Sequence, residues 1–129
     1  MKTRKINFAG QTYYLLFNGT AMFAFDDAFG GSSAYLEKSG TPGKDAFDAV
    51  CTAASILAEQ GELARRALGY ESAPILERET LLACVTPADI LSLRQATLSA
   101  ILAGYGREVE SSDDIDLDLM ELEQKKTKS

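Results

Sequence analysis

The sequence contains no histidine, no tryptophan and only two cysteines. Without histidine, the chain has no Ser-His or Cys-His nucleophile pair, no imidazole base and few of the ligand sets that bind zinc. Cys51 and Cys84 stand among apolar neighbours without a Cys-x-x-Cys partner, so we expect two buried, reduced thiols. These absences predict a protein that is not an enzyme and that uses no metal or cofactor.

The chain also lacks a long apolar run and an excess of basic residues. No stretch approaches the roughly 18 apolar residues of a membrane span, and MKTRKINFAGQ is not followed by the apolar stretch of a secretion signal. The formal net charge of -6 at pH 7 would repel phosphates, which nucleic-acid-binding proteins neutralise with clustered Lys and Arg. We therefore expect a cytoplasmic protein that binds neither nucleic acid nor membrane.

Two short motifs resemble ligand loops but lack residues that those loops need. The segment GTPGKD resembles the end of a phosphate loop. Lys38, two residues before the segment, stands where that loop requires Gly, and Asp45 stands where it requires Ser or Thr. The aspartates in residues 114-118 have the spacing of the first ligands of a calcium loop, but Leu119 and Lys125 replace its Gly and Glu. Neither nucleotide nor calcium binding is expected.

The chain of 129 residues, 46% of them hydrophobic, predicts a single α+β domain, mostly α, over residues 1-108. Apolar and polar residues alternate on both sides of Ala9-Gly10, which predicts a β-hairpin over about residues 4-17. Helical periodicity follows over about residues 20-106. An isolated hairpin is marginal in water, so we expect its apolar face to pack on a bundle of four to five helices.

Glycines lie between and at the ends of the first predicted helices. Thr20 is the expected N-cap of a short helix, after which residues 30-43 indicate a flexible connector with at most a short turn or helix. A long amphipathic helix then starts at Lys44, passes a candidate bend at Gly61 and stops at Gly69.

Two further helices follow the long one. The first covers about residues 76-84, after Pro74. The second has Thr86 as N-cap, Pro87 at the first helical position and Asp89 at the third, and it ends around the sequence GYG.

Apolar residues at helical spacing identify candidate core residues. In FNGTAMFAFDDAFGG they recur at i, i+3 and i+7, and the long helix carries a second stripe. Such stripes are more often core than ligand site. The core candidates are Met22, Phe25 and Phe29 in the short helix, and Phe47, Val50, Cys51 and Leu57 in the long helix.

The composition changes in residues 109-129, which are acidic first and then basic. This pattern is typical of a mobile tail. Apolar residues are interleaved with the acids, which a merely solubilising tail would not need, so folding upon a partner is the alternative. The partner-binding candidates in the tail are Ile115, Leu117, Leu119 and Leu122.

Three segments in this order and spacing resemble one protein family. NFAGQTYYLLFNGTAMFAFDDAFG contains a G-x-x-Y-x-L hairpin, then Ala21-Met22 and Phe25-x-x-x-Phe29-Gly30. LAEQGELARRALGYE and TPADILSLRQATLSAILAGYGRE follow it. Over roughly residues 5-108, the chain resembles the tail assembly chaperones of long-tailed bacteriophages and prophages.

The resemblance implies a non-enzymatic protein that coats the helical tape measure protein, helps to recruit tail tube subunits and leaves before the virion is complete. It implies location in the cytoplasm of the bacterial host and absence from the mature virion. We expect a homo-oligomer, with Tyr13, Tyr14 and Phe23 left partly exposed for partner binding, although burial in the core is the alternative. Two other functions stay open: a structural head-tail connector or tail-completion protein, and an acidic regulatory adaptor that acts through its tail.

Overall fold

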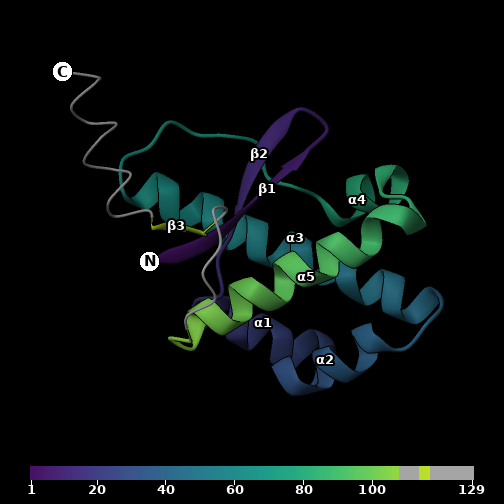
Figure 1. Ribbon diagram of the computed structural model, residues 1–129. Coiled ribbons are helices and arrows are strands. Elements are labelled where there is room, and N and C mark those ends of the chain that lie inside the picture. The colour runs from purple at the N-terminus through teal and green to yellow at the C-terminus, as the bar shows by residue number, and fades with distance from the viewer. Residues whose placement is uncertain (108–113, 117–129) are drawn as a thin grey trace.

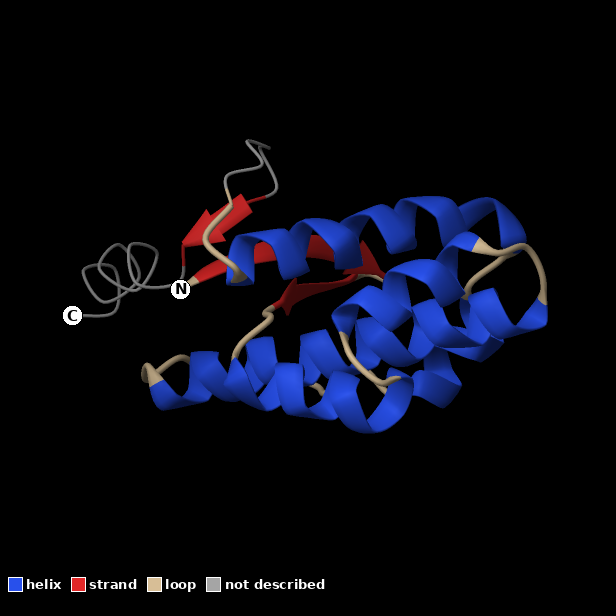
Figure 2. Ribbon diagram, turned by 90° about the horizontal axis from the view of Figure 1, so that it is seen from below, coloured by secondary structure: helices blue, strands red, loops and turns tan. Residues whose placement is uncertain are grey.

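The computed structural model describes residues 1–107 and 114–116. The fold is α+β and mostly α, with an antiparallel hairpin lying over a group of helices (Figure 1). Seen from below, the helices lie in front of the strands, which are visible between them (Figure 2). The elements are β1 (Lys2–Phe8), β2 (Gln11–Leu15), α1 (Gly19–Phe29), α2 (Ser32–Gly40), α3 (Lys44–Ala67), α4 (Arg78–Cys84), α5 (Pro87–Gly104) and β3 (Asp114–Asp116).

The expected N-terminal hairpin is confirmed. Ala9 and Gly10 both have positive φ, 51° and 77°, as the two-residue turns that match the twist of a hairpin require. Phe8 pairs with Gln11 across this turn. The second strand ends at Leu15, earlier than expected, because the backbone N–H of Leu16 donates instead to Leu57 O of α3 at 3.1 Å.

The outer edge of β2 lies directly against α3. A Cβ atom at Gly61 would stand 1.7 Å from Tyr14 O, so only glycine permits this approach. The helix continues through Gly61 to Ala67, and this glycine serves a contact between helix and strand. Strand β2 is therefore closed to further strand pairing by a helix, one of the ways in which proteins protect sheet edges.

A third strand comes from the segment expected to be a mobile tail. Strand β3 pairs antiparallel with β1, so the sheet order is β2-β1-β3. The register places Asp114 opposite Arg4, Ile115 opposite Thr3 and Asp116 opposite Lys2. Residues 114–116 of the predicted tail form this short strand, and the rest of residues 109-129 lies outside the described residues.

Helix α1 starts at Gly19, two residues earlier than Thr20 would allow as an N-cap. The cap is Asn18, whose side-chain oxygen accepts from Ala21 N at 2.9 Å. The amide nitrogen of the same side chain donates to Gln60 of α3 at 3.2 Å, so the cap also ties α1 to the long helix. At the other end Gly30 adopts φ 88° and donates to Asp26 O, the left-handed helix stop expected from glycine.

The expected flexible connector contains helix α2, which is nine residues long. Its anchor is Tyr35, which is fully buried and forms a 2.7 Å hydrogen bond with Thr97 of α5. The Tyr35 ring packs against Phe25 and Phe29 of α1, with centroid separations of 5.3 and 5.0 Å. The short helix that the sequence left open at this point is formed, and the segment is less flexible than its glycines indicate, because the long-range burial of one tyrosine outweighs the composition around it.

Most core candidates lie in or against one hydrophobic core. Phe25, Val50, Cys51 and Leu57 are buried. Met22, Phe29 and Phe47 are half-buried and pack around that core. Cys84 is exposed at the end of α4, so the expectation of two buried thiols is wrong for this residue.

The starts of the two final helices differ in how closely they follow the sequence signals. At α5 the backbone N–H of Thr86 donates to Asp89 Oδ2 at 3.2 Å, as the capping signal predicts. Helix α4 begins at Arg78 rather than near residue 76. Leu76 is buried against α3 and its carbonyl accepts from Ser55 Oγ at 3.0 Å, which holds this residue outside the helix.

Replacing Gly61 with Ala tests the contact between β2 and α3. Alanine favours a helix by about 1 kcal/mol over glycine, so without the contact the substitution would stabilise the protein. With Tyr14 O in the way, we expect Gly61→Ala to lower the free energy of unfolding by about 3 kcal/mol in urea titrations. The control is Gly19→Ala at the start of α1, where a Cβ meets no atom within 4 Å and stability should hold or rise.

The burial of Tyr35 predicts a loss of stability at alkaline pH. Burial raises the pKa of Tyr35 from 10.0 to about 12, because the charged phenolate is poorly solvated there. The resulting stabilisation is complete below pH 10 and is lost as the pH rises to about 12, on the order of 2 kcal/mol in total. In urea titrations from pH 9 upward, Tyr35→Phe should flatten this decline. Equal slopes for Tyr35→Phe and wild type would contradict the assignment.

Candidate functional site

Two kinds of functional element are absent from the described residues. In residues 1–107 and 114–116, no cluster of three or more Cys, Asp or Glu side chains is arranged to hold a metal ion. No helix in the same part of the chain is long and apolar enough to cross a membrane. Burial raises the pKa of the Cys51 thiol, which keeps it protonated at neutral pH. The prominent surface features are two grooves, one between helices and one beside β1.

The first, which we call the helical groove, has a volume of about 840 Å³. It lies where the start of α3, helix α4, the first turns of α5 and the loop between α2 and α3 meet. This volume is typical of sites that enclose a small ligand or a few anchoring side chains. The apolar residues that line it are Ala46, Phe47, Val50, Leu82, Ile90 and Leu91.

The helical groove is apolar yet accessible. Val50 is buried beneath it, Phe47, Leu82 and Ile90 are half-buried, and Leu91 is 60% exposed. A leucine this exposed is common when it stands alone, but next to other apolar side chains it is typical of a binding surface. The arrangement therefore offers a hydrophobic strip to a partner.

Local sequence explains how these side chains reach the groove. The capping box at Thr86 starts α5 at Pro87, which places Ile90 and Leu91 within the first two turns. Gly43, with φ 118°, lets the chain turn from α2 into α3, so that Phe47 lies in the first turn of that helix. The groove is thus built from helix starts, held by a cap and a glycine.

Basic side chains border the apolar strip. Lys44 is exposed at the start of α3. Arg78 pairs with Asp48 and donates to Thr52 at 3.0 Å, and the hydrogen bond to Asp48 raises the pKa of Arg78. Arg94 donates to Ser39 Oγ at 3.0 Å. Asp48, which also lines the groove, neutralises Arg78. In a chain with net charge -6, Lys44, Arg94 and the positive ends of α3 and α5 favour an acidic neighbour at this groove.

The partner-binding candidates Tyr13, Tyr14 and Phe23 are not brought together with the helical groove. Phe23 is 64% exposed on α1. Tyr13 is half-buried and packs against the core. Tyr14 is half-buried too, with the Arg65 guanidinium carbon 5.5 Å from its ring centre.

The four tail candidates divide between described and undescribed parts of the chain. Ile115 belongs to β3, where its backbone is in register with Thr3 of β1. Leu117, Leu119 and Leu122 lie outside the described residues. Of the tail positions proposed for partner binding, one is therefore placed, and it takes part in the sheet.

Sequence reasoning did not single out Leu82, Leu91, Arg78 or Arg94 as site residues. One available signal was the sequence ILSL at the start of α5. Positions on a helix are about 100° apart, so Ile90, Leu91 and Leu93 span too wide an arc to face one core. In the structure Leu91 is the one that remains exposed.

Comparisons of the chain with protein-family models, with curated proteins and with solved structures gave no match. A function for the chain therefore has to follow from its residues and from the two grooves.

A fluorescent probe can test whether the helical groove binds apolar ligands. The dye 1-anilinonaphthalene-8-sulfonate combines an apolar ring system with a negative charge, which suits the apolar strip and its basic border. We expect Leu91→Asp to reduce dye fluorescence at least twofold, because it adds a like charge and removes apolar surface. Leu63→Asp, at a 43% exposed leucine on α3 outside the groove, should leave the fluorescence unchanged. Equal fluorescence for both variants would place the dye elsewhere.

Proposed function

We propose that the protein is a tail assembly chaperone that binds apolar helical stretches of a phage tape measure protein. The observation that carries this proposal is the helical groove, in which Phe47, Leu82 and Leu91 offer an accessible apolar strip between helices. An amphipathic helix binds such a groove with side chains at i, i+3 or i+4, and i+7. The resemblance of residues 5-108 to this chaperone family supports the same function.

The charges around the groove narrow the kind of helix that fits. Lys44 and Arg94 favour a client with Asp or Glu beside its apolar stripe. A groove of about 840 Å³ accommodates only a few anchoring side chains, so each copy would bind weakly. Many copies along one extended helical client would bind firmly through multivalency.

The family resemblance also implies a cellular location, an oligomeric state and a second partner. The protein acts in the cytoplasm of the bacterial host as a homo-oligomer, helps to recruit tail tube subunits and is not an enzyme. It leaves the client when tube subunits polymerise, so the mature virion does not contain it. Weak individual sites suit this release, because the tube can displace the copies one at a time.

Coexpression tests the client. The tagged chain would be produced together with the untagged tape measure protein encoded in the same tail gene cluster. We expect wild type and Leu63→Asp to keep the tape measure protein soluble and to copurify with it. Leu91→Asp should reduce the copurified amount at least fivefold while its thermal unfolding stays unchanged, since the substitution is at the surface. Failure of the wild type to copurify with the tape measure protein would overturn the proposal.

Mass spectrometry of purified virions separates the chaperone from the structural alternative. Absence of the chain from particles, together with copurification of the tape measure protein, is the expected result. Presence in stoichiometric amounts would instead favour a head-tail connector or tail-completion protein.

A further inference from the structure

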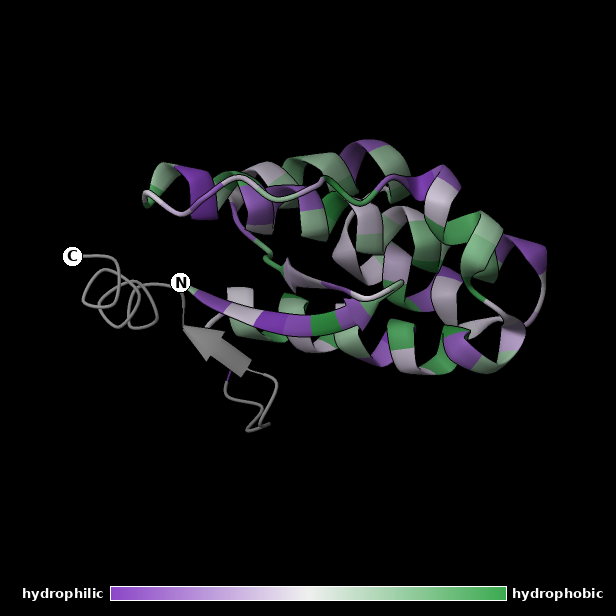
Figure 3. Ribbon diagram, turned by 90° about the horizontal axis from the view of Figure 1, so that it is seen from above, coloured by the Kyte–Doolittle hydropathy of each residue, from purple (hydrophilic) through white to green (hydrophobic). Residues whose placement is uncertain are grey.

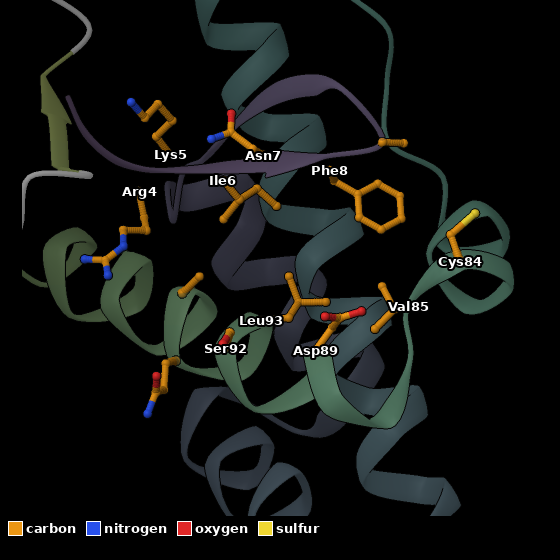
Figure 4. Close-up of a pocket in the computed structure, with 13 residues that line it drawn as sticks. Arg4, Lys5, Ile6, Asn7, Phe8, Cys84, Val85, Asp89, Ser92 and Leu93 are labelled. Carbon is orange, nitrogen blue, oxygen red and sulfur yellow. The ribbon is translucent and has the colours of Figure 1, made fainter.

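Helix α5 separates the helical groove from the sheet. The groove beside β1, of about 760 Å³, lies between β1 and one side of α5. On that side, Leu93 faces Ile6 and Phe8 of β1 (Figure 4). Leu91 and Arg94 instead line the helical groove. The helical groove therefore lies on the side of α5 that is turned away from β1.

The position of β3 determines where the chain beyond Asp116 begins. Strand β3 is antiparallel to β1, and Asp116 lies opposite Lys2. The chain thus runs toward the Lys2 end of β1 and away from Phe8, which lines a groove together with Asp89 at the start of α5. Lys2 and Phe8 are about 20 Å apart, at roughly 3.3 Å per strand residue. In Figure 1, β3 and α4, which borders the helical groove, lie at opposite ends of the molecule.

The residues that follow Asp116 match the chemistry of the helical groove. Residues 117–123 have the sequence LDLMELE and lie outside the described residues; we call them the acidic leucine segment. Their apolar side chains suit the apolar strip of the groove, and their acids suit Lys44 and Arg94 at its border. Strand β1, beside which the segment begins, is largely hydrophilic and offers leucines little apolar surface (Figure 3).

The acidic leucine segment begins too far from the helical groove of its own copy. A fully extended chain covers at most about 3.6 Å per residue, so Leu117 and Leu119 end within about 11 Å of Asp116. The start of α5 is about 20 Å away along β1, and the groove lies beyond it on the far side of the helix. These leucines therefore fit the helical groove of a second copy, not their own.

We propose that the acidic leucine segment of one copy binds the helical groove of a second copy and occupies it until a client helix displaces it. The two surfaces in contact differ, so the contact is heterologous and joins copies head to tail. The contact itself needs only the groove and the segment. Its displacement by a client rests on the proposed chaperone function.

Photocross-linking of the full-length protein tests the contact in the absence of a client. Leu119→benzoylphenylalanine places a photoreactive side chain in the segment, and isotope-labelled and unlabelled copies are mixed before irradiation. Mass spectrometry should find position 119 linked to peptides that contain Phe47 or Leu91. The two linked peptides should include pairs from differently labelled copies, as a contact between copies requires.

Two surface variants in the same photoreactive background provide the comparison. Leu91→Asp should reduce the yield of these cross-links at least fivefold, because it removes apolar surface and adds a charge like those of the segment. Leu63→Asp, at an exposed leucine of α3 outside the groove, should leave the yield unchanged. Equal yields for the two variants would overturn the proposal. Cross-links confined to single copies, or to peptides outside the helical groove, would overturn it as well.

A second measurement tests displacement by the client. Coexpression with the tape measure protein should lower the yield of cross-links between copies at least fivefold. An unchanged yield despite copurified tape measure protein would overturn the displacement. Failure of the tape measure protein to copurify would overturn the chaperone function alone, because the contact between copies is measured without it.

Discussion

The end of β2 lies between two glycines on two different helices, and the rest of the fold depends on this close approach. A Cβ at Gly61 of α3 would stand 1.7 Å from Tyr14 O, and one at Gly104 of α5 would stand 2.4 Å from Phe17 O. Because both positions lack a side chain, the segment from Tyr14 to Phe17 enters between the helices. Leu15, Leu16 and Phe17 are buried there, and the Phe17 ring meets Phe25 edge-on at 5.4 Å, which joins the hairpin to α1.

Helix α3 makes this arrangement possible because the residues at most of its contact positions are small. It contacts every other described helix and β2. Small side chains let helices and strands approach closely. In such a densely packed interior, even a change of one methyl group in side-chain volume affects the packing. The buried small residues of α3 are Ala46, Ala49, Cys51, Ala53, Ala54, Ala58 and Gly61.

The same packing determines where binding surfaces remain. Helix α3 closes the outer edge of β2, and β1 pairs on its other side with β3. Helix α5 contributes to both grooves: Ile90, Leu91 and Arg94 line the helical groove, and Ser92 and Leu93 line the groove beside β1.

Local signals in the sequence determined several elements. The turn at Ala9-Gly10, the capping box at Thr86 and the glycine stop at Gly30 involve residues within a few positions of one another, so their chemistry can be read without the fold. Only the tertiary structure decided that α2 is a helix, because its anchor Tyr35 is buried by α1 and α5. The helical groove likewise arises where elements distant in sequence meet. Periodicity marks apolar residues as buried, but which of them stay accessible depends on the partner that each helix face finds.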